Sequence, residues 1–250
     1  MYNEIKKIIK AILPKSILFK YEPQIRYLIY LIFKGNNFQC NICNKGLRRF
    51  ISYHKDKLCP NCGSLSRTRR LWAILQTEFI KEKIKILDFS PSRSLYRVLK
   101  KNSLLSYSST DLSGDFLSDY HYDITHIDSQ NETYDLIICY HILEHIENDS
   151  LAMKELWRIT KNGGCCIIQT PFKEGNIYED NSIKSPTERL KHFGQKDHVR
   201  IYSINGLKQR LTDIGFQVDI REYNEEIGNN FGYNTNETIL ICTKQIDLYN

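Results

Sequence analysis

Four of the eight cysteines form two closely spaced pairs, Cys40 with Cys43 and Cys59 with Cys62. Two Cys-x-x-Cys pairs separated by 15 residues present four thiolates to a single tetrahedral ion, most often zinc. Four protein ligands leave no position for water or substrate, so the site would be structural. We therefore predict a zinc-binding clip that holds a segment too small to bury its own core.

Acidic and aromatic residues stand where apolar runs end. Asp88 ends the run 83–90, Asp111 ends the run 104–112, Asp123 follows DYHY, and Tyr140 with His141 ends YDLIICYHI. In a parallel sheet the ligand crevice lies at the carboxyl ends of the strands, near the point where strand order reverses. An Asp after the second strand is the type that accepts hydrogen bonds from ribose hydroxyls, although a turn-forming role is the alternative for any single Asp.

The segment HILEH places His141, Glu144 and His145 within one or two helical turns of each other. Three ligands of these types could hold a divalent cation with positions left open for substrate oxygens. In the alternative, Glu144 and His145 cap a helix and brace the neighbouring loop. We favour this alternative, because the sequence fixes no fourth ligand.

Residues 173–203 form a long polar segment that leaves the carboxyl end of a strand and is placed to cover the crevice as a lid. His198 is the expected general base, with Asp197 orienting its ring, and His145 is a further catalytic candidate. Polar groups of this kind suit sugar hydroxyls, and an arginine could clamp a carboxylate or phosphate. The expected substrate-binding residues are Asp180, Arg189, Gln195 and Arg200. The alternative is a solvated loop with internal salt bridges.

The elements that must position these residues alternate between strand and helix. Strands are expected at 83–90, 104–112, 134–142, 163–172, 216–223 and 238–244, and helices at 92–101, 149–160 and 204–214. This alternation predicts a mostly parallel sheet covered on both faces. We expect four regions: basic amphipathic helices at 1–36, the clip at 37–65, a bridging helix at 66–82 and the main domain at 83–250.

The front of the chain is basic. Residues 1–72 carry 15 Lys and Arg against 3 Asp and Glu, whereas the remainder carries 20 against 26. Such an excess attracts nucleic acid, an anionic membrane surface or a polyanionic substrate. The apolar stripes at 5–13 and 21–35 are expected to pack against the main domain, with contact at a membrane interface as the alternative. We find no apolar run long enough to span a bilayer and expect a cytoplasmic protein, with peripheral contact at the inner face of the membrane as the variant.

The segments KILDFS, SSTDL, DYHYDI and YDLIICYHILEHI through NGGCCIIQTP resemble the successive motifs of class I S-adenosylmethionine-dependent methyltransferases of the type 11-like kind, over residues 83–244. The resemblance implies a Rossmann-like α/β fold with a seven-stranded sheet whose last strand is antiparallel. A small helical and zinc-ribbon-like appendage would precede it. A similar bacterial branch also carries a four-cysteine clip and a segment like FGQKDHVRIY, and belongs to surface-polysaccharide gene clusters.

The resemblance also implies S-adenosylmethionine as cofactor. Asp111 would bind the ribose hydroxyls and Asp123 the adenine amino group, while Tyr140 and His141 would line the pocket. The full expected cofactor set is Asp88, Ser90, Asp111, Leu112, Asp123, Ile124, Tyr140 and His141. The first loop departs from the family, because residues 89–93 read FSPSR where glycine is usual. We expect serine hydroxyls and backbone groups to replace the missing contacts.

We predict a methyltransferase that O-methylates a sugar or surface-glycan acceptor, anionic or lipid-linked. One alternative keeps the enzyme but makes RNA the acceptor, bound through Arg67, Arg69 and Arg70 of the basic front. Another is a catalytically degenerate binding module, suggested by the glycine-free loop.

Overall fold

The computed structural model describes residues 15–54, 56–80, 83–224 and 228–245. The chain divides into two compact units, one formed by Met1–Ile74 with Ile227–Asn234 and the other by Leu75–Glu226 with Thr235–Asn250. The apolar stripe at 5–13 lies outside the described residues. We describe each unit separately.

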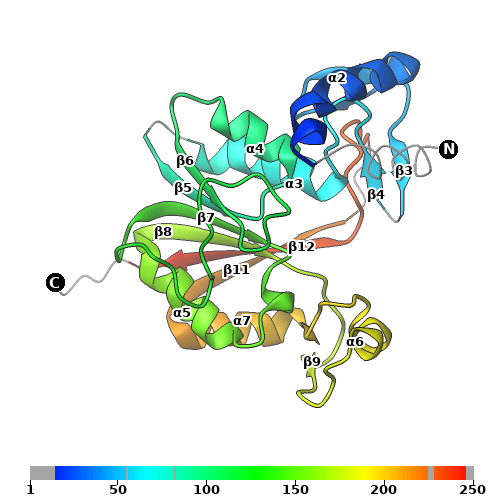
Figure 1. Ribbon diagram of the computed structural model, residues 1–250. Coiled ribbons are helices and arrows are strands. Elements are labelled where there is room, and N and C mark those ends of the chain that lie inside the picture. The colour runs from blue at the N-terminus through cyan, green and yellow to red at the C-terminus, as the bar shows by residue number, and fades with distance from the viewer. Residues whose placement is uncertain (1–14, 55, 81–82, 225–227, 246–250) are drawn as a thin grey trace. The chain divides into compact units, whose positions relative to one another are not determined.

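The larger unit contains a six-stranded sheet with the order β11-β12-β8-β7-β5-β6 (Figure 1). Neighbours among β5, β6, β7 and β8 run parallel, while β12 and β11 are antiparallel to their neighbours. The strands are β5 (Lys85–Phe89), β6 (Ser106–Thr110), β7 (Tyr134–Tyr140), β8 (Thr160–Gln169), β11 (Phe216–Tyr223) and β12 (Glu237–Lys244). This arrangement confirms the predicted Rossmann-like α/β fold with its antiparallel closing hairpin.

The described sheet has six strands, not the seven that the resemblance implied. At the expected place of the seventh strand, a single parallel bridge joins Thr110 to Tyr120. The Asp119 carboxylate accepts hydrogen bonds from the backbone N–H and the hydroxyl of Ser109, at 3.0 and 3.1 Å. A side chain therefore satisfies the β6 edge where a further strand would have paired.

Helices cover both faces of this sheet. In Figure 1, α5 (Asp149–Ile159) and α7 (Ile204–Ile214) lie side by side on one face, and α4 (Arg93–Lys100) lies on the other. The side chains of Ser92, Asn148 and Ser203 cap the three helices by accepting hydrogen bonds from first-turn N–H groups. The core joins α5 and α7 to the apolar strands through Met153, Leu156, Leu207, Leu211, Leu87, Ile137 and Ile168.

The predicted lid has some regular structure of its own. Its strands β9 (Tyr178–Glu179) and β10 (Arg200–Ile201) pair in antiparallel fashion, and α6 (Pro186–Phe193) lies between them in the sequence. Ser185 caps α6 and Gly194 ends it in the left-handed conformation. The segment is therefore a small folded element and not a solvated loop.

The first described element of the smaller unit is α2 (Lys15–Phe33). Two hairpins follow, β1 (Lys34–Cys40) with β2 (Lys45–Leu47) and β3 (Ile51–Tyr53) with β4 (Asp56–Leu58), and then α3 (Ser66–Ile74). The π-helical turn Leu75–Phe79 opens the larger unit. Among the helices that the structure describes, none is long and apolar enough to cross a bilayer.

Candidate active site and metal centre

The loop after β5 compensates for its missing glycine through Ser90. Ser90 takes the left-handed conformation at φ +47°, a region that glycine ordinarily occupies. Its N–H donates to Thr110 O at 2.8 Å and its hydroxyl donates to Asp111 Oδ1 at 2.7 Å. The loop is thereby tied to the end of β6. That serine and backbone groups of this loop contact the cofactor in place of glycine stays a prediction.

Asp111 follows β6 and is buried. Besides Ser90, it accepts hydrogen bonds on Oδ2 from the Ser113 hydroxyl at 2.9 Å and from the Asp115 N–H at 3.1 Å. The two serine hydroxyls therefore occupy one lone pair on each oxygen of this carboxylate. Next to this carboxylate, the Leu112 side chain is 64% exposed and offers an apolar surface.

Asp123 lies at the surface, where its Oδ1 accepts hydrogen bonds from the Thr125 N–H and hydroxyl at 2.8 and 2.7 Å. These two hydrogen bonds lower the pKa of Asp123, so it is ionised at neutral pH. Its neighbour Ile124 is buried in the hydrophobic core. The Ile124 side chain is therefore not open to solvent beside Asp123, and the cofactor contact predicted for this residue would have to come from its backbone.

Asp88 does not line a crevice, contrary to expectation. Its side chain is completely buried, and its Oδ2 accepts a hydrogen bond from the Tyr107 hydroxyl at 3.1 Å. Burial raises the pKa of Asp88 to about 8, although the Tyr107 hydrogen bond opposes the shift. Asp88 is thus a largely protonated core residue near neutral pH.

Tyr140 and His141 lie where β7 ends, at the switch between β5 and β7. His141 takes a left-handed φ of +57°, and its N–H donates to Gln169 O at the end of β8. Its Nδ1 lies 3.2 Å from Glu144 Oε1. Both residues stand at the predicted carboxyl-end edge of the sheet.

A cluster of titratable side chains follows directly. Ligand atoms of Glu144, His145 and His198 all lie within 4.8 Å of one another. The rings of His145 and His198 meet edge to face at 4.6 Å between centroids. The lid thus brings His198 to Glu144 and His145, which the 3₁₀ turn Leu143–His145 carries. The predicted cation ligands are His141, Glu144 and His145. In the structure His198 takes the place of His141 in this group, and His141 instead contacts Glu144.

The predicted pairing of Asp197 with His198 is wrong. Asp197 Oδ2 lies 3.2 Å from His145 Nδ1, and the His198 ring is hydrogen-bonded to the Phe193 backbone. The two side chains are adjacent in sequence but serve different partners. Asp197 therefore orients His145.

Burial and neighbouring charges together set the protonation states of this cluster. Burial opposes ionisation of Glu144, but the hydrogen bond and charge of His141 outweigh it, so the pKa of Glu144 lies below its usual value. Burial, followed by the charge of His145, lowers the pKa of His198. The cluster therefore pairs a carboxylate with a neutral imidazole at physiological pH.

Arg200 is a structural residue and not the predicted substrate clamp. Its side chain is 5% exposed, with Nε 2.8 Å from Glu179 Oε2, and Nη2 donates to Glu147 O at 2.9 Å. Its Nη1 donates to Ile146 O. Arg210 completes the network by pairing with Asp149 and Glu179. The network lines a polar cleft of about 420 Å³. The hydrogen bonds of Arg200 to two backbone carbonyls and its ion pair with Asp149 anchor the lid to residues 146–149.

The other predicted lid residues remain nearer the surface. Arg189 Nη2 lies 3.0 Å from Glu147 Oε1. Asp180 is exposed and accepts hydrogen bonds from the N–H and hydroxyl of Ser182, and Gln195 is exposed as well. Tyr107, which contacts Asp88, and Arg210, which pairs with Asp149 and Glu179, were not identified from the sequence. Both residues lie within a regular strand or helix, and no motif marks them.

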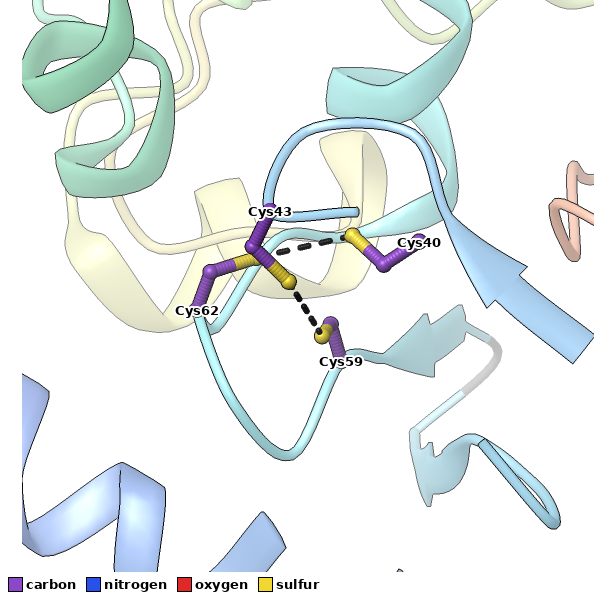
Figure 2. A group of neighbouring side chains, drawn as sticks. All are labelled: Cys40, Cys43, Cys59 and Cys62. Carbon is purple, nitrogen blue, oxygen red and sulfur yellow. Dashed lines mark hydrogen bonds between the residues drawn. The ribbon is translucent and has the colours of Figure 1, made fainter. Parts of the chain in front are cut away.

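In the smaller unit, the four clip cysteines converge (Figure 2). Cys40 Sγ lies 3.6 Å from Cys62 Sγ, and Cys43 Sγ lies 3.8 Å from Cys59 Sγ. A tetrahedron with metal–sulfur distances of about 2.3 Å has sulfur–sulfur edges of about 3.8 Å. All four are free thiols, so the residues fit a tetrahedral zinc ion.

Arg69 stands beside this centre and is completely buried. Its guanidinium donates to the carbonyl oxygens of Ser64, Phe231 and Gly232 at 2.6 to 2.8 Å and stacks on the Phe50 ring. Arg70 is also buried, over the ring of Tyr233. Two of the three arginines predicted to contact RNA are therefore structural.

Parallel strands with a switch between β5 and β7, and a buried Asp after the second strand, define the architecture of class I methyltransferases. The family described as "Methyltransferase domain" matches residues 64–219. The chain belongs to this family and is an S-adenosylmethionine-dependent methyltransferase.

Solved structures share the fold at low sequence identity. Bacillus subtilis YcgJ matches with a TM-score of 0.51 and 10% identity, covering 71% of this chain and 99% of its own. Haemonchus contortus phosphoethanolamine N-methyltransferase 2, solved with phosphomonomethylethanolamine and S-adenosylhomocysteine, matches with a TM-score of 0.53 and 12% identity. The match covers 71% of this chain and 52% of that protein. The [4+2]-cyclase SpnF matches with a TM-score of 0.52 and 12% identity, covering 92% of this chain and 94% of its own. No protein of curated function matches the chain.

Proposed function

We propose that this methyltransferase transfers the methyl group of S-adenosylmethionine to a hydroxyl of a sugar or glycan. The observation that carries the proposal is the cluster of Glu144, His145 and His198 beneath a polar lid at the end of β7. A hydroxyl is a weak nucleophile and benefits from a positioned proton acceptor. His198 has a lowered pKa and is neutral at physiological pH, so it suits that role.

Binding of the cofactor would use the strand-end residues. The ribose hydroxyls would replace the Ser90 and Ser113 hydroxyls on Asp111, exposed Leu112 would contact the adenine face, and Asp123 would accept from the adenine amino group. The sulfonium cofactor supplies an electrophilic methyl group. The protein's remaining task is to align the acceptor oxygen with that methyl group and to exclude water.

The lid supports a polar acceptor. Asp180 and Gln195 are exposed on it, and the partly buried Arg189 of α6 pairs with the exposed Glu147. Carboxylate, amide and guanidinium groups match the hydroxyls and anionic substituents of surface glycans. We exclude Arg200 from this role because its donors are engaged within the fold.

Isotopic methyl transfer tests the proposal. The purified chain, labelled S-adenosylmethionine and separate pools of glycans, lipid-linked sugars and RNA would be incubated together. We expect label in the glycan or lipid-linked sugar pool, and none with Asp111→Ala. Asp128→Ala, which changes an exposed carboxylate, serves as the matched control. Label in RNA or protein alone would overturn the acceptor assignment.

We also propose that Cys40, Cys43, Cys59 and Cys62 hold a structural zinc ion. The supporting observations are the sulfur–sulfur distances and the buried Arg69, whose positive charge balances part of the excess negative charge of four thiolates. Such a metal would stabilise the short hairpins of the smaller unit.

The smaller unit is, we propose, a peripheral membrane contact that brings the enzyme to a lipid-linked acceptor. The observation is an apolar face of α2 on which Tyr21, Leu28, Leu31 and Ile32 are 48 to 72% exposed. Exposed cations in the same unit complement an anionic lipid surface: Lys20, Lys34, Lys45, Arg48 and Arg49. Apolar insertion combined with basic charge is the pattern of interfacial helices.

A further inference from the structure

We propose that Glu144, His145 and His198 bind a divalent first-row transition-metal cation. The three side chains come from two separate segments, the turn after β7 and the end of the lid, yet their ligand atoms lie within 4.8 Å of one another. Two imidazoles and one carboxylate form a recognised ligand set for such cations. The proposal that a cation binds depends only on these distances. The role of the cation in methylation rests on the proposed function.

Two buried atoms in the cluster have hydrogen-bonding capacity that the described chain does not use. Glu144 Oε2 and His198 Nε2 are buried and have no hydrogen-bond partner among the described residues. The residues that carry them are 1% and 3% exposed. Buried polar atoms are nearly always satisfied, so an orphaned carboxylate oxygen next to an orphaned imidazole nitrogen points to a missing ligand. A cation satisfies both, because both are electron-pair donors.

Each proposed ligand also has an outer partner that fixes its orientation. Asp197 Oδ2 lies 3.2 Å from His145 Nδ1, and His141 Nδ1 lies 3.2 Å from Glu144 Oε1. The His198 ring is hydrogen-bonded to the Phe193 backbone, and because Nε2 is unpartnered, Nδ1 makes that bond. Metal-binding histidines characteristically donate their second nitrogen to a carboxylate or backbone carbonyl. Both histidines here follow that rule.

The ligand types indicate the class of cation. Imidazole nitrogen favours manganese, iron, cobalt, nickel or zinc over magnesium and calcium, which prefer oxygen alone. Three protein ligands leave positions open. In the loaded protein an acceptor hydroxyl would occupy one of them. The cation would activate it by lowering the hydroxyl pKa, and His198, as a ligand, would no longer serve as the proton acceptor.

The reaction balances with this cation in place. The acceptor O–H would release its proton to solvent as the oxygen binds the cation, before water is excluded, and an oxygen lone pair would then form the new O–CH₃ bond. The S–CH₃ bond breaks with its electron pair on sulfur, which leaves as the neutral thioether of the demethylated cofactor. The cation changes no oxidation state.

Manganese binding by the zinc-replete full chain tests the site. Titration with Mn²⁺, followed by loss of the free-ion electron paramagnetic resonance signal, should show one high-affinity site per chain. We expect His198→Ala to abolish that site and Asp197→Ala, which changes a side chain that is 68% exposed, to weaken it by about 10- to 100-fold. His126→Ala, an exposed histidine outside the cluster, should bind as the parent does.

Circular dichroism would establish that each variant is folded. If His198→Ala does not fold, Asp197→Ala still tests the site. Absence of a high-affinity site in the parent chain, or binding unchanged in both cluster variants, would overturn the proposal. Mn²⁺ binding without glycan methylation would leave the site standing and reject the acceptor. Glycan methylation that is insensitive to chelation, together with no Mn²⁺ binding, would support the glycan acceptor and reject the cation site.

Discussion

The hydroxyl of Ser90 donates to Asp111 Oδ1 across 2.7 Å, which joins the end of β5 to the end of β6. A left-handed serine thus takes the place of a glycine, and its side chain supplies a contact that glycine lacks. The loop is therefore shaped to hold this carboxylate in place at the end of β6.

Asp111→Ala should abolish most of the affinity for S-adenosylmethionine. Hydrogen bonds to a charged group contribute about 1.5 to 3 kcal/mol, so we expect binding to weaken by about 10- to 100-fold or more. Calorimetric titration with the cofactor and its demethylated product measures the change. Ser90→Gly should retain binding because glycine tolerates φ +47°. Unchanged affinity in Asp111→Ala would contradict the assigned ribose contact.

Asp88 should make stability fall as the pH rises. Its pKa is about 8 in the folded chain and about 3.9 when unfolded, so between these values the folded state holds a proton that the unfolded state has lost. The contribution is present in full below pH 4 and disappears as the pH rises through 8. The slope is at most about 1.4 kcal/mol per pH unit.

Denaturant unfolding of Asp88→Asn at several pH values between 5 and 8 measures this slope. The neutral amide should flatten it relative to the parent chain. Asp128→Asn, at an exposed position, should leave the parent slope unchanged. If both variants behave alike, burial of Asp88 is not the cause.

Removal of the proposed zinc ion should loosen the smaller unit. Cys59→Ala is expected to lower the zinc content from one ion per chain to none, measured by elemental analysis, and to make residues 34–65 susceptible to proteolysis. Cys165→Ala, which alters a half-buried thiol outside the clip, is the control. Retention of zinc in Cys59→Ala would show that the four thiols are not the ligand set.

Sequence patterns sufficed wherever local spacing sets the structure. The helix expected at 204–214 has those bounds, and β11 spans the expected 216–223, because polar and glycine residues delimit short apolar runs. The four cysteines converge for the same reason, since each knuckle is a local turn.

Contacts that depend on long-range folding could not be read from the sequence. Asp197 pairs with His145 and not with its neighbour His198, and Arg200 enters an internal network, because the lid folds back onto the turn after β7. The direction of the Asp88 side chain depends on Tyr107 across the sheet. No periodicity encodes such pairings.

Replacing Leu28 and Ile32 by Glu should abolish attachment to anionic membranes. Both side chains lie on the exposed face of α2, at 66% and 72% exposure, where insertion of their apolar surface into the interface would be favourable. Co-sedimentation with vesicles containing phosphatidylserine should fall for this variant and, for the parent chain, at high salt, since screening weakens the basic contribution. Leu104→Glu changes a residue of the larger unit with similar exposure, 56%, and should bind as the parent does. Equal binding by the parent chain, the α2 variant and Leu104→Glu would show that the membrane contact lies outside this face of α2. If none of the three binds vesicles, the proposed membrane contact is wrong.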